Sequence, residues 1–136
     1  MDYLGGRAVI RKTIRSRLDL VPLVRAGLPY AALEAVGSRL HVTPETAATA
    51  LLLPARTLAR RKADGKLDAY ESERVVRLAD VAARAAEVLG EDNIARWLME
   101  HNQALGGATP MEMLDTDLGC EAVKDILGRI EHGVFS

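Results

Sequence analysis

Apolar residues recur at spacings of three and four along most of the chain, which is the period of an amphipathic helix. The clearest stripe runs through Val75, Leu78, Ala82, Ala85 and Leu89. No window alternates apolar and polar residues at a period of two between turn signals, so the sequence predicts no sheet. The expected fold class is therefore all-α. The stripe is typical of a helix facing a core, and its small Ala side chains also fit a helix–helix dimer contact.

Capping signals set the ends of the predicted helices. The runs Thr43-Pro44-Glu45 and Thr109-Pro110-Met111-Glu112 each place a Thr cap before a Pro, with an acid in the first turn. Glycines after several apolar stretches predict helix ends. On these signals we expect helices over residues 19–26, 30–40, 43–51, 54–63, 68–89, 92–100, 109–114 and 116–131.

Composition narrows the class of protein. The 136-residue chain is 49% hydrophobic but only 4% aromatic, so its core must be largely aliphatic. Its one cysteine, Cys120, cannot form an internal disulfide, which fits a reducing compartment. No apolar run approaches the roughly 20 residues that span a bilayer. The sequence thus predicts a soluble, cytoplasmic protein.

Charge is unevenly distributed although the net charge is only −1. Residues 54–66 hold five basic side chains and one acid, whereas residues 107–136 hold six acids and two bases. A basic middle and an acidic end suggest two faces with different partners.

The basic segment has the outline of a helix-turn-helix, because two short helices are joined there by the tight turn Leu51-Leu52-Leu53. Such turns often use Gly. On the second helix, Ala55, Leu58 and Ala59 are expected to face the core. Arginine offers paired donors to guanine edges, and Arg and Lys neutralise phosphate. The predicted DNA-binding residues are Arg56, Thr57, Arg60, Arg61 and Lys62. The alternative is a solvated cationic helix face.

No set of side chains indicates catalysis or metal binding. His41, His101 and His132 lie far apart in the sequence, and Cys120 has no Cys or His at a metal-ligand spacing. A lone Cys on an apolar helix face is most often a buried side chain. Gly106-Gly107 lacks the Lys of a phosphate loop. We therefore expect no enzyme activity, no catalytic residues, no metal and no cofactor.

Four ordered motifs resemble the Xre/MbcA/ParS antitoxins. They are R-x-L-x-R-R-K-x-x-G-x-L at 56–67, E-S-x-R-x-x-R-L at 71–78, N-x-A-L-G-G-x-T-P at 102–110 and L-x-R-I-E-H-G-V at 127–134. The segment GLPYAALEAV at 27–36 is also similar to the N-terminal helical part of those proteins. The resemblance covers roughly Leu20 to the end of the chain.

The resemblance implies a two-part antitoxin. Residues 19–66 would form an Xre-like helix-turn-helix unit and residues 67–136 a helical toxin-binding domain. Residues 1–18 lie outside the resemblance; because they are basic and weakly patterned, we expect a flexible basic arm, or a partly helical one. The implied partners are operator DNA, through which the protein represses its own operon, and a cognate RES-type toxin that destroys NAD. Because operators are usually symmetric, a homodimer is expected.

The resemblance also assigns toxin contact to the end of the chain, where it would cover the substrate entrance of the toxin. The expected contact residues are Arg129, Glu131, His132, Gly133, Val134, Phe135 and Ser136. A short tail bearing Phe135 suits a concave pocket, and nearby acids suit one lined with Arg. The alternative for the tail is a frayed terminus. For the whole chain, the alternative is a stand-alone helix-turn-helix regulator with a C-terminal dimerisation domain.

Overall fold

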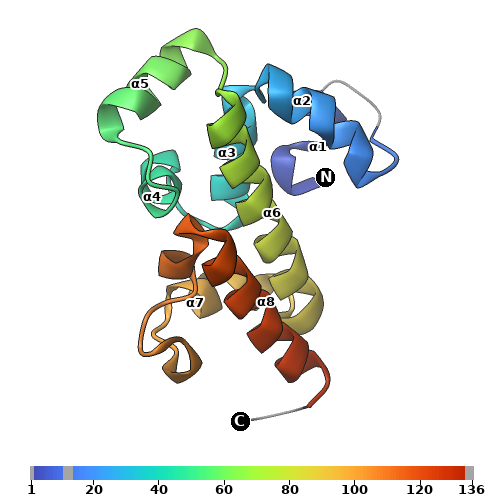
Figure 1. Ribbon diagram of the computed structural model, residues 1–136, viewed down its shortest axis with the longest axis vertical. Helices are drawn as coiled ribbons and strands as arrows, with labels where there is room; N and C mark the ends of the chain where they lie inside the picture. The colour runs from blue at the N-terminus through green and yellow to red at the C-terminus, as the bar shows by residue number, and fades with distance from the viewer. Residues whose placement is uncertain (1, 11–13, 134–136) are drawn as a thin grey trace. The chain divides into compact units, whose positions relative to one another are not determined.

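The computed structural model describes residues 2–10 and 14–133, and within them the chain is helical (Figure 1). The α-helices are α1 (Gly6–Ile10), α2 (Leu20–Ala26), α3 (Tyr30–Arg39), α4 (Pro44–Ala50), α5 (Ala55–Asp64), α6 (Ala69–Leu89), α7 (Ile94–Met99) and α8 (Asp117–Glu131). The 3-10 helices are η1 (Asp2–Leu4), η2 (Arg17–Asp19), η3 (Glu91–Asn93), η4 (Gln103–Leu105) and η5 (Met111–Asp115). Over these ranges no strand forms, and the all-α prediction is confirmed.

The chain forms two compact units that divide between Ala79 and Asp80, inside α6. The sequence placed the start of the C-terminal domain at residue 67, ahead of this helix. The first turns of α6 belong to the first unit because their polar groups bond there. The Ser72 hydroxyl, which is fully buried, accepts a hydrogen bond from the Leu28 backbone N–H at 2.8 Å.

The first unit is held together by its loops as well as its helices. The Tyr30 N–H donates to the Gly65 carbonyl at 2.9 Å, and the Leu67 N–H donates to the Leu28 carbonyl at 2.8 Å. These bonds tie the loop before α3 to the loop after α5. Gly27 makes this possible: its φ is +98°, and a Cβ there would lie 2.1 Å from the Leu67 carbonyl oxygen.

Residues 2–10 of the predicted N-terminal arm are helical and packed. They form η1 and α1, and the side chains of Tyr3, Leu4 and Ile10 are buried. The Arg39 guanidinium lies 4.6 Å from the centre of the Tyr3 ring, a cation–π distance. The arm was predicted from the basic residues of the segment, but the buried side chains of Tyr3 and Leu4 determine how it packs.

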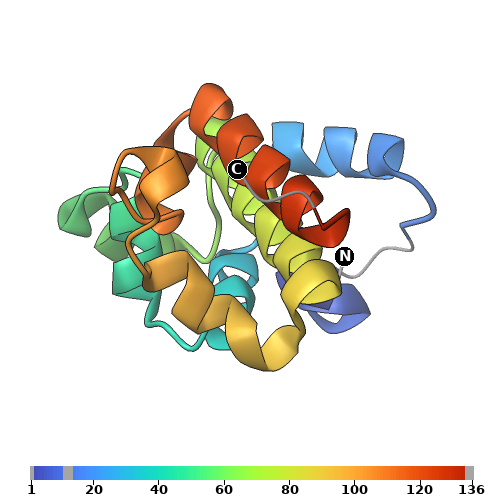
Figure 2. The same ribbon diagram turned by 90° about the horizontal axis from the view of Figure 1, so that it is seen from below.

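The second unit is organised by polar caps at its turns. The hydroxyls of Thr109 and Thr116 accept hydrogen bonds from the N–H groups of Glu112 and Gly119. The first cap opens the 3-10 helix η5 rather than the predicted α-helix, and the second opens α8. Figures 1 and 2 both show α8 beside the C-terminal half of α6.

The core of the second unit is aliphatic, as the composition predicts. Leu98, Leu114 and Leu127 are fully buried. Trp97, on α7, is only half-buried. Along the described part of the chain, no helix is long and apolar enough to cross a membrane.

The apolar stripe of α6 is core, as predicted. Val75, Leu78, Ala82 and Ala85 are all fully buried, and only Leu89 at the end of the helix is partly exposed. Because the stripe is covered within the chain, it is not available as the alternative dimer contact.

Candidate functional site

The turn between α4 and α5 adopts the compact geometry of a helix-turn-helix. Thr43 caps α4 by accepting the Thr46 N–H at 3.1 Å, with Pro44 as the first helical residue. Leu51 and Leu53 are buried, while Leu52 between them is 59% exposed and has a φ of +60°. Leu52 thus adopts the left-handed conformation that Gly usually supplies in such turns.

Hydrogen bonds fix the turn from both sides. The Leu53 N–H donates back to the Ala48 carbonyl at 2.8 Å. The Arg74 guanidinium, on α6, donates to the Leu51 carbonyl at 3.3 Å. The entry angle of α5 is therefore set by contacts to α4 and α6, without a glycine.

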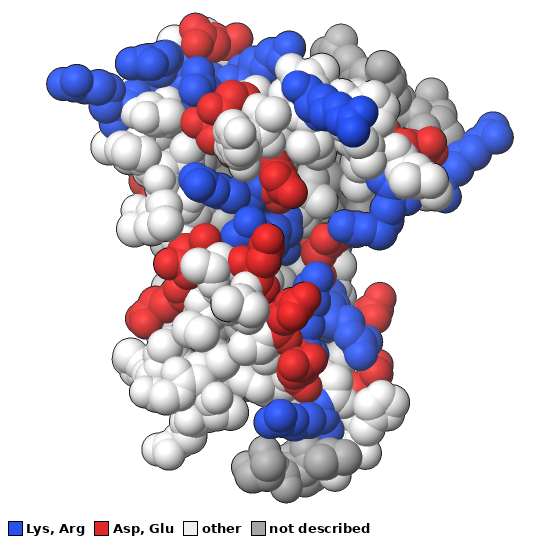
Figure 3. Space-filling model, viewed as in Figure 1, with Lys and Arg blue, Asp and Glu red and all other residues white. Residues whose placement is uncertain are grey.

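Helix α5 presents a basic face to solvent. Arg56, Arg60 and Lys62 are exposed, and Thr57 is half-buried. Figure 3 shows Lys and Arg side chains gathered over α5. The expected inner face was only partly right: Leu58 is buried, whereas Ala55 and Ala59 are exposed. A single Leu suffices to seat the helix because the loops at both of its ends are bonded to the rest of the unit.

Arg61 differs from its neighbours because it is engaged inside the fold. Its Nε donates to Glu71 Oε1 at 2.7 Å, and its Nη2 lies 3.3 Å from Asp68 Oδ2. The hydrogen bond to Glu71, more than the charges of Glu71 and Asp68, raises the pKa of Arg61 above its usual value. Of the five predicted DNA-binding residues, this one has its guanidinium turned toward α6.

Glu71 joins the two helices because it also caps α6. Its Oε1 accepts the Asp68 N–H at 2.9 Å, and the Asp68 carboxylate accepts the Glu71 N–H at 2.7 Å. This reciprocal pair is a capping box at the start of α6, where the sequence predicts a helix from residue 68. Glu71 is only 5% exposed, so its partners screen a carboxylate that would be costly to bury alone.

The exposed side chains of α5 can recognise a polyanion. Arg56 and Arg60 are one helical turn apart, so both project from the same side of α5. Two guanidinium groups at this spacing can donate paired hydrogen bonds to base edges or to phosphates, and Lys62 adds a third cation.

The end of α8 is the second candidate site. The Arg84 guanidinium donates two hydrogen bonds to the Glu131 carboxylate, at 2.9 and 2.6 Å, and one to Glu87 at 3.2 Å. These bonds fix the last turn of α8 to α6. The hydrogen bonds from Arg84, and then its charge, lower the pKa of Glu131 below its usual value.

Three of the predicted contact residues near this pair are exposed. Arg129, His132 and Gly133 are on the surface, and Gly133 has a φ of +71°. The other three predicted contact residues, Val134, Phe135 and Ser136, lie outside the described residues. At the opposite end of α8, Leu118 is 81% exposed.

The remaining chemistry is sparse. Cys120 is buried, as predicted, with its sulfur 3.9 Å from the Leu114 carbonyl oxygen. Across residues 2–10 and 14–133, no group of three or more His, Cys, Asp or Glu side chains could hold a metal ion.

A bonded tight turn with arginines exposed on its second helix defines a helix-turn-helix protein. Residues 19–80 match the antitoxin Xre-like helix-turn-helix domain, and residues 84–133 match the antitoxin Xre/MbcA/ParS C-terminal toxin-binding domain. The two matches adjoin and together cover most of the chain. The chain belongs to the Xre/MbcA/ParS antitoxin family, as its motifs indicated.

Curated relatives agree with this assignment. The chain is 38% identical over 87 residues to Antitoxin Xre of Yersinia enterocolitica, covering 62% of this chain and 59% of the relative. It is 39% identical over 84 residues to Antitoxin Xre of Pseudomonas putida, covering 60% and 53%. It is 27% identical over 132 residues to the Prs ADP-ribosylating antitoxin of a Sphingobium species, covering 89% and 83%. The matches to the Xre relatives thus span less than two thirds of their length.

Proposed function

We propose that this chain is the antitoxin of a type II toxin–antitoxin pair, in which residues 84–133 and the tail bind the toxin and residues 19–80 bind operator DNA. One observation carries the proposal. A helix-turn-helix match with exposed arginines and a toxin-binding-domain match occur in one chain, in that order. Neither half is expected to be an enzyme.

The toxin partner we propose is a RES-type enzyme that consumes NAD. The motifs at 102–110 and 127–134 support this class. The relative named Prs ADP-ribosylating antitoxin, whose alignment covers 89% of this chain, supports a second kind of NAD-consuming toxin as the partner. In that case the toxin would transfer ADP-ribose from NAD to a protein rather than degrade NAD outright. The two activities differ in whether a protein acceptor is needed.

Inhibition would work by covering the toxin's substrate entrance with the C-terminal end of α8 and the tail. Residues 129–136 are the proposed contact region. Within it, Glu131 is held by Arg84, so its part is to fix the direction in which the chain leaves α8. Phe135 would fill an apolar part of the pocket, and the neighbouring acids suit arginines that bind pyrophosphate.

Operator binding would use the exposed face of α5. Arg56, Arg60 and Lys62 are the proposed direct contacts, with Thr57 at the edge of the face. Arg61 would act indirectly, because its bond to Glu71 holds α5 to α6. Autorepression follows if the operator overlaps the promoter of the chain's own operon, and a symmetric operator requires two copies.

The experiment is co-expression with the product of the neighbouring gene, followed by an NAD-consumption assay. We expect a stable complex and loss of NAD consumption when this chain is added. An assay with and without a protein acceptor then separates NAD degradation from ADP-ribosylation. If the chain bound its promoter but formed no complex and silenced no NAD-consuming enzyme, it would instead be a stand-alone regulator.

A further inference from the structure

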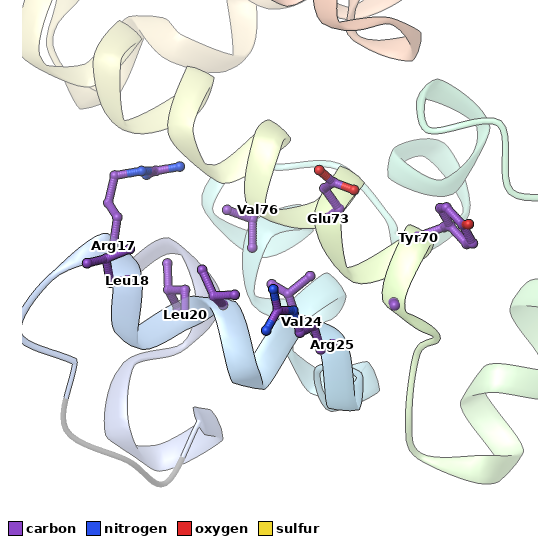
Figure 4. Close-up of a pocket in the computed structure, with 10 residues that line it drawn as sticks. Arg17, Leu18, Leu20, Val24, Arg25, Tyr70, Glu73 and Val76 are labelled. Carbon is purple, nitrogen blue, oxygen red and sulfur yellow. The ribbon is translucent and has the colours of Figure 1, made fainter.

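Two surfaces of the described residues take no part in the sites above. The first is an open groove of about 580 Å³ in the first unit, between η2–α2 and the start of α6. Figure 4 shows Arg17, Arg25 and Glu73 along this groove, so charged side chains line it on both sides. The second is the loop at residues 101–110, between α7 and η5. Because protein interfaces are depleted of charged residues at their centres, the loop is the better candidate for a protein contact.

The composition of residues 101–110, the uncharged loop, is unusual for this chain. They include no Asp, Glu, Lys or Arg, although these residues make up 27% of the whole chain. The loop contains the N-x-A-L-G-G-x-T-P motif at 102–110, which belongs neither to the DNA-binding face nor to the tail. Figure 3 shows an area without Lys, Arg, Asp or Glu at the lower left of the second unit, where Figure 1 places this loop.

Hydrogen bonds centred on Asn102 hold the uncharged loop in one conformation. The Asn102 N–H donates to the Ala108 carbonyl at 2.9 Å, and the Asn102 carbonyl accepts the Gly107 N–H at 3.0 Å. The Asn102 side-chain oxygen accepts the Ala104 N–H at 3.0 Å. His101 Nδ1 donates to the Gly107 carbonyl at 2.8 Å. A loop that is ordered in this way loses little conformational entropy when a partner binds it.

The surface of the uncharged loop is open to a partner. Ala104, Gly106 and Gly107 are exposed, and a Cβ at either glycine would meet nothing within 4 Å. Another backbone can therefore approach the loop closely at its glycines. Met99, two residues before the loop, is 47% exposed, and methionine is enriched at protein interfaces.

We propose that the uncharged loop is the main anchor for the body of the toxin, whereas the tail covers the toxin's substrate entrance. This inference rests on the proposed function. The loop lies within residues 84–133, which match the toxin-binding domain, and η4 inside the loop packs against α8. Figure 1 shows the loop and the C-terminal end of α8 toward the same end of the second unit. One globular partner can therefore contact both.

The chemistry of the uncharged loop defines the toxin surface that it fits. A surface without charges suits an apolar, uncharged area beside the substrate entrance rather than an entrance lined with arginines. The acids near the end of the chain suit that entrance instead. The two contacts therefore divide the work, because the loop supplies most of the affinity and the tail supplies the inhibition.

The first test is isothermal titration calorimetry of the full chain with the purified product of the neighbouring gene. Ala104→Glu and Met99→Glu each add a charge at an exposed side chain, so neither disturbs the core. In an uncharged contact the added charge loses its hydration without gaining a partner. We therefore expect each variant to raise the dissociation constant at least about tenfold. Ala63→Glu, at an exposed Ala of α5 outside residues 84–133, is the matched control and should bind like the wild type.

The second test is NAD consumption by the same toxin, which separates the loop from the tail. When enough of either loop variant is added to saturate the toxin, we expect full inhibition, because the tail is intact. A variant that lacks residues 133–136 should leave activity at saturation. Helical circular dichroism verifies that every variant is folded.

Wild-type affinity in both loop variants would overturn the proposal and leave the proposed function standing. A loop variant that saturates the toxin but leaves its activity would also overturn it, since the loop would then act at the substrate entrance. If the loop variants changed only the oligomeric state of the free chain, the loop would be a contact between copies instead. If the wild-type chain bound no toxin, the proposed function would fail, and this proposal would fail with it.

Discussion

At the scale of single residues, the backbone of the α4–α5 turn is unusual at Leu52. Its φ of +60° is disfavoured for a side chain with a Cβ, at a cost of about 1–2 kcal/mol. The side chain is largely exposed, so little burial offsets that cost. The buried neighbours Leu51 and Leu53 and the bond from Arg74 hold the turn in place.

Replacing Leu52 by Gly should therefore stabilise the protein. The relief of strain exceeds the added entropy of the unfolded chain, so we expect the free energy of unfolding to rise by roughly 0.5–1 kcal/mol. Urea denaturation measures it. Leu52→Ala is the control, because it shortens the same side chain but keeps the Cβ. An equal gain in both variants would show that the exposed Leu side chain, not the backbone, is responsible.

Two glycines of α8 should respond to Ala in opposite directions. A Cβ at Gly119 would lie 1.9 Å from the Met113 carbonyl oxygen, whereas a Cβ at Gly128 meets nothing within 4 Å. Gly119→Ala should lower the free energy of unfolding by about 1–3 kcal/mol through overpacking. Gly128→Ala should raise it by about 0.5–1 kcal/mol through helix propensity. Thermal denaturation measures the stability of both variants. If Gly119→Ala lost no stability, the close packing of η5 on α8 would be contradicted.

At the scale of elements, α5 is seated by very little apolar surface. Leu58 is its only buried side chain among those described. The clamp between Arg61 and Glu71 therefore has a large share in fixing the direction of α5. Because Glu71 also caps α6, disturbing this carboxylate affects both helices.

The variants Arg60→Ala and Arg61→Ala should both bind DNA more weakly, but only Arg61→Ala should also be less stable. Arg60→Ala should weaken binding to the chain's own promoter, lower the salt slope by about one and leave the melting temperature unchanged. Arg61→Ala should weaken binding too, but with a lower melting temperature, because the clamp is lost. Arg96→Ala, an exposed residue of α7, is the control for both. If Arg61→Ala kept the wild-type melting temperature and lowered the salt slope by one, Arg61 would be a phosphate contact instead.

The Arg84–Glu131 pair predicts an acid-sensitive helix end. Arg84 lowers the pKa of Glu131 below its ordinary value of 4.5. The stabilisation is therefore fully present above pH 4.5 and is lost as the pH falls through the depressed pKa. The difference in melting temperature between wild type and Glu131→Gln should be constant from about pH 7 to about pH 5, then shrink toward about pH 3. A difference that does not vary with pH would mean that the carboxylate is not stabilised by its charge.

At the scale of the whole molecule, charge is sorted between the regions proposed to meet different partners. The chain is almost neutral, yet bases outnumber acids five to one in residues 54–66, and acids outnumber bases six to two in residues 107–136. A polyanion is attracted by a positive electrostatic potential, whereas an arginine-lined protein pocket is attracted by a negative one. Because the basic and acidic segments are separate along the chain, one small protein can present both potentials.

Most of the fold was predictable because its signals are local. Thr43, Thr116 and the box at Asp68–Glu71 cap helices through bonds that span three residues, and such bonds follow directly from sequence. Features that depend on distant packing were missed. The packing of Tyr3 and the exposure of Ala55 and Ala59 are set by residues that periodicity alone does not bring together.

The candidate sites were predictable in outline for the same reason. The i, i+4 spacing of Arg56 and Arg60 places them on one side of α5, which the sequence shows. It does not show that Arg61 turns to Glu71, ten residues away, or that Arg84 meets Glu131, 47 residues away. The E-S-x-R motif at 71–74 was a signal for the first of these, because an acid in a capping box next to a basic helix is a natural partner for Arg.

The most direct measurement is a titration of the cognate toxin's NAD consumption with this chain, compared with a variant that lacks residues 133–136. The account predicts that the wild-type chain silences NAD consumption at stoichiometric amounts, whereas the truncated chain binds more weakly and leaves activity. Leu18→Ala, an exposed residue outside the toxin-binding residues 84–133, should inhibit like the wild type. Full inhibition by the truncated chain would contradict the proposed covering of the toxin's substrate entrance by the tail.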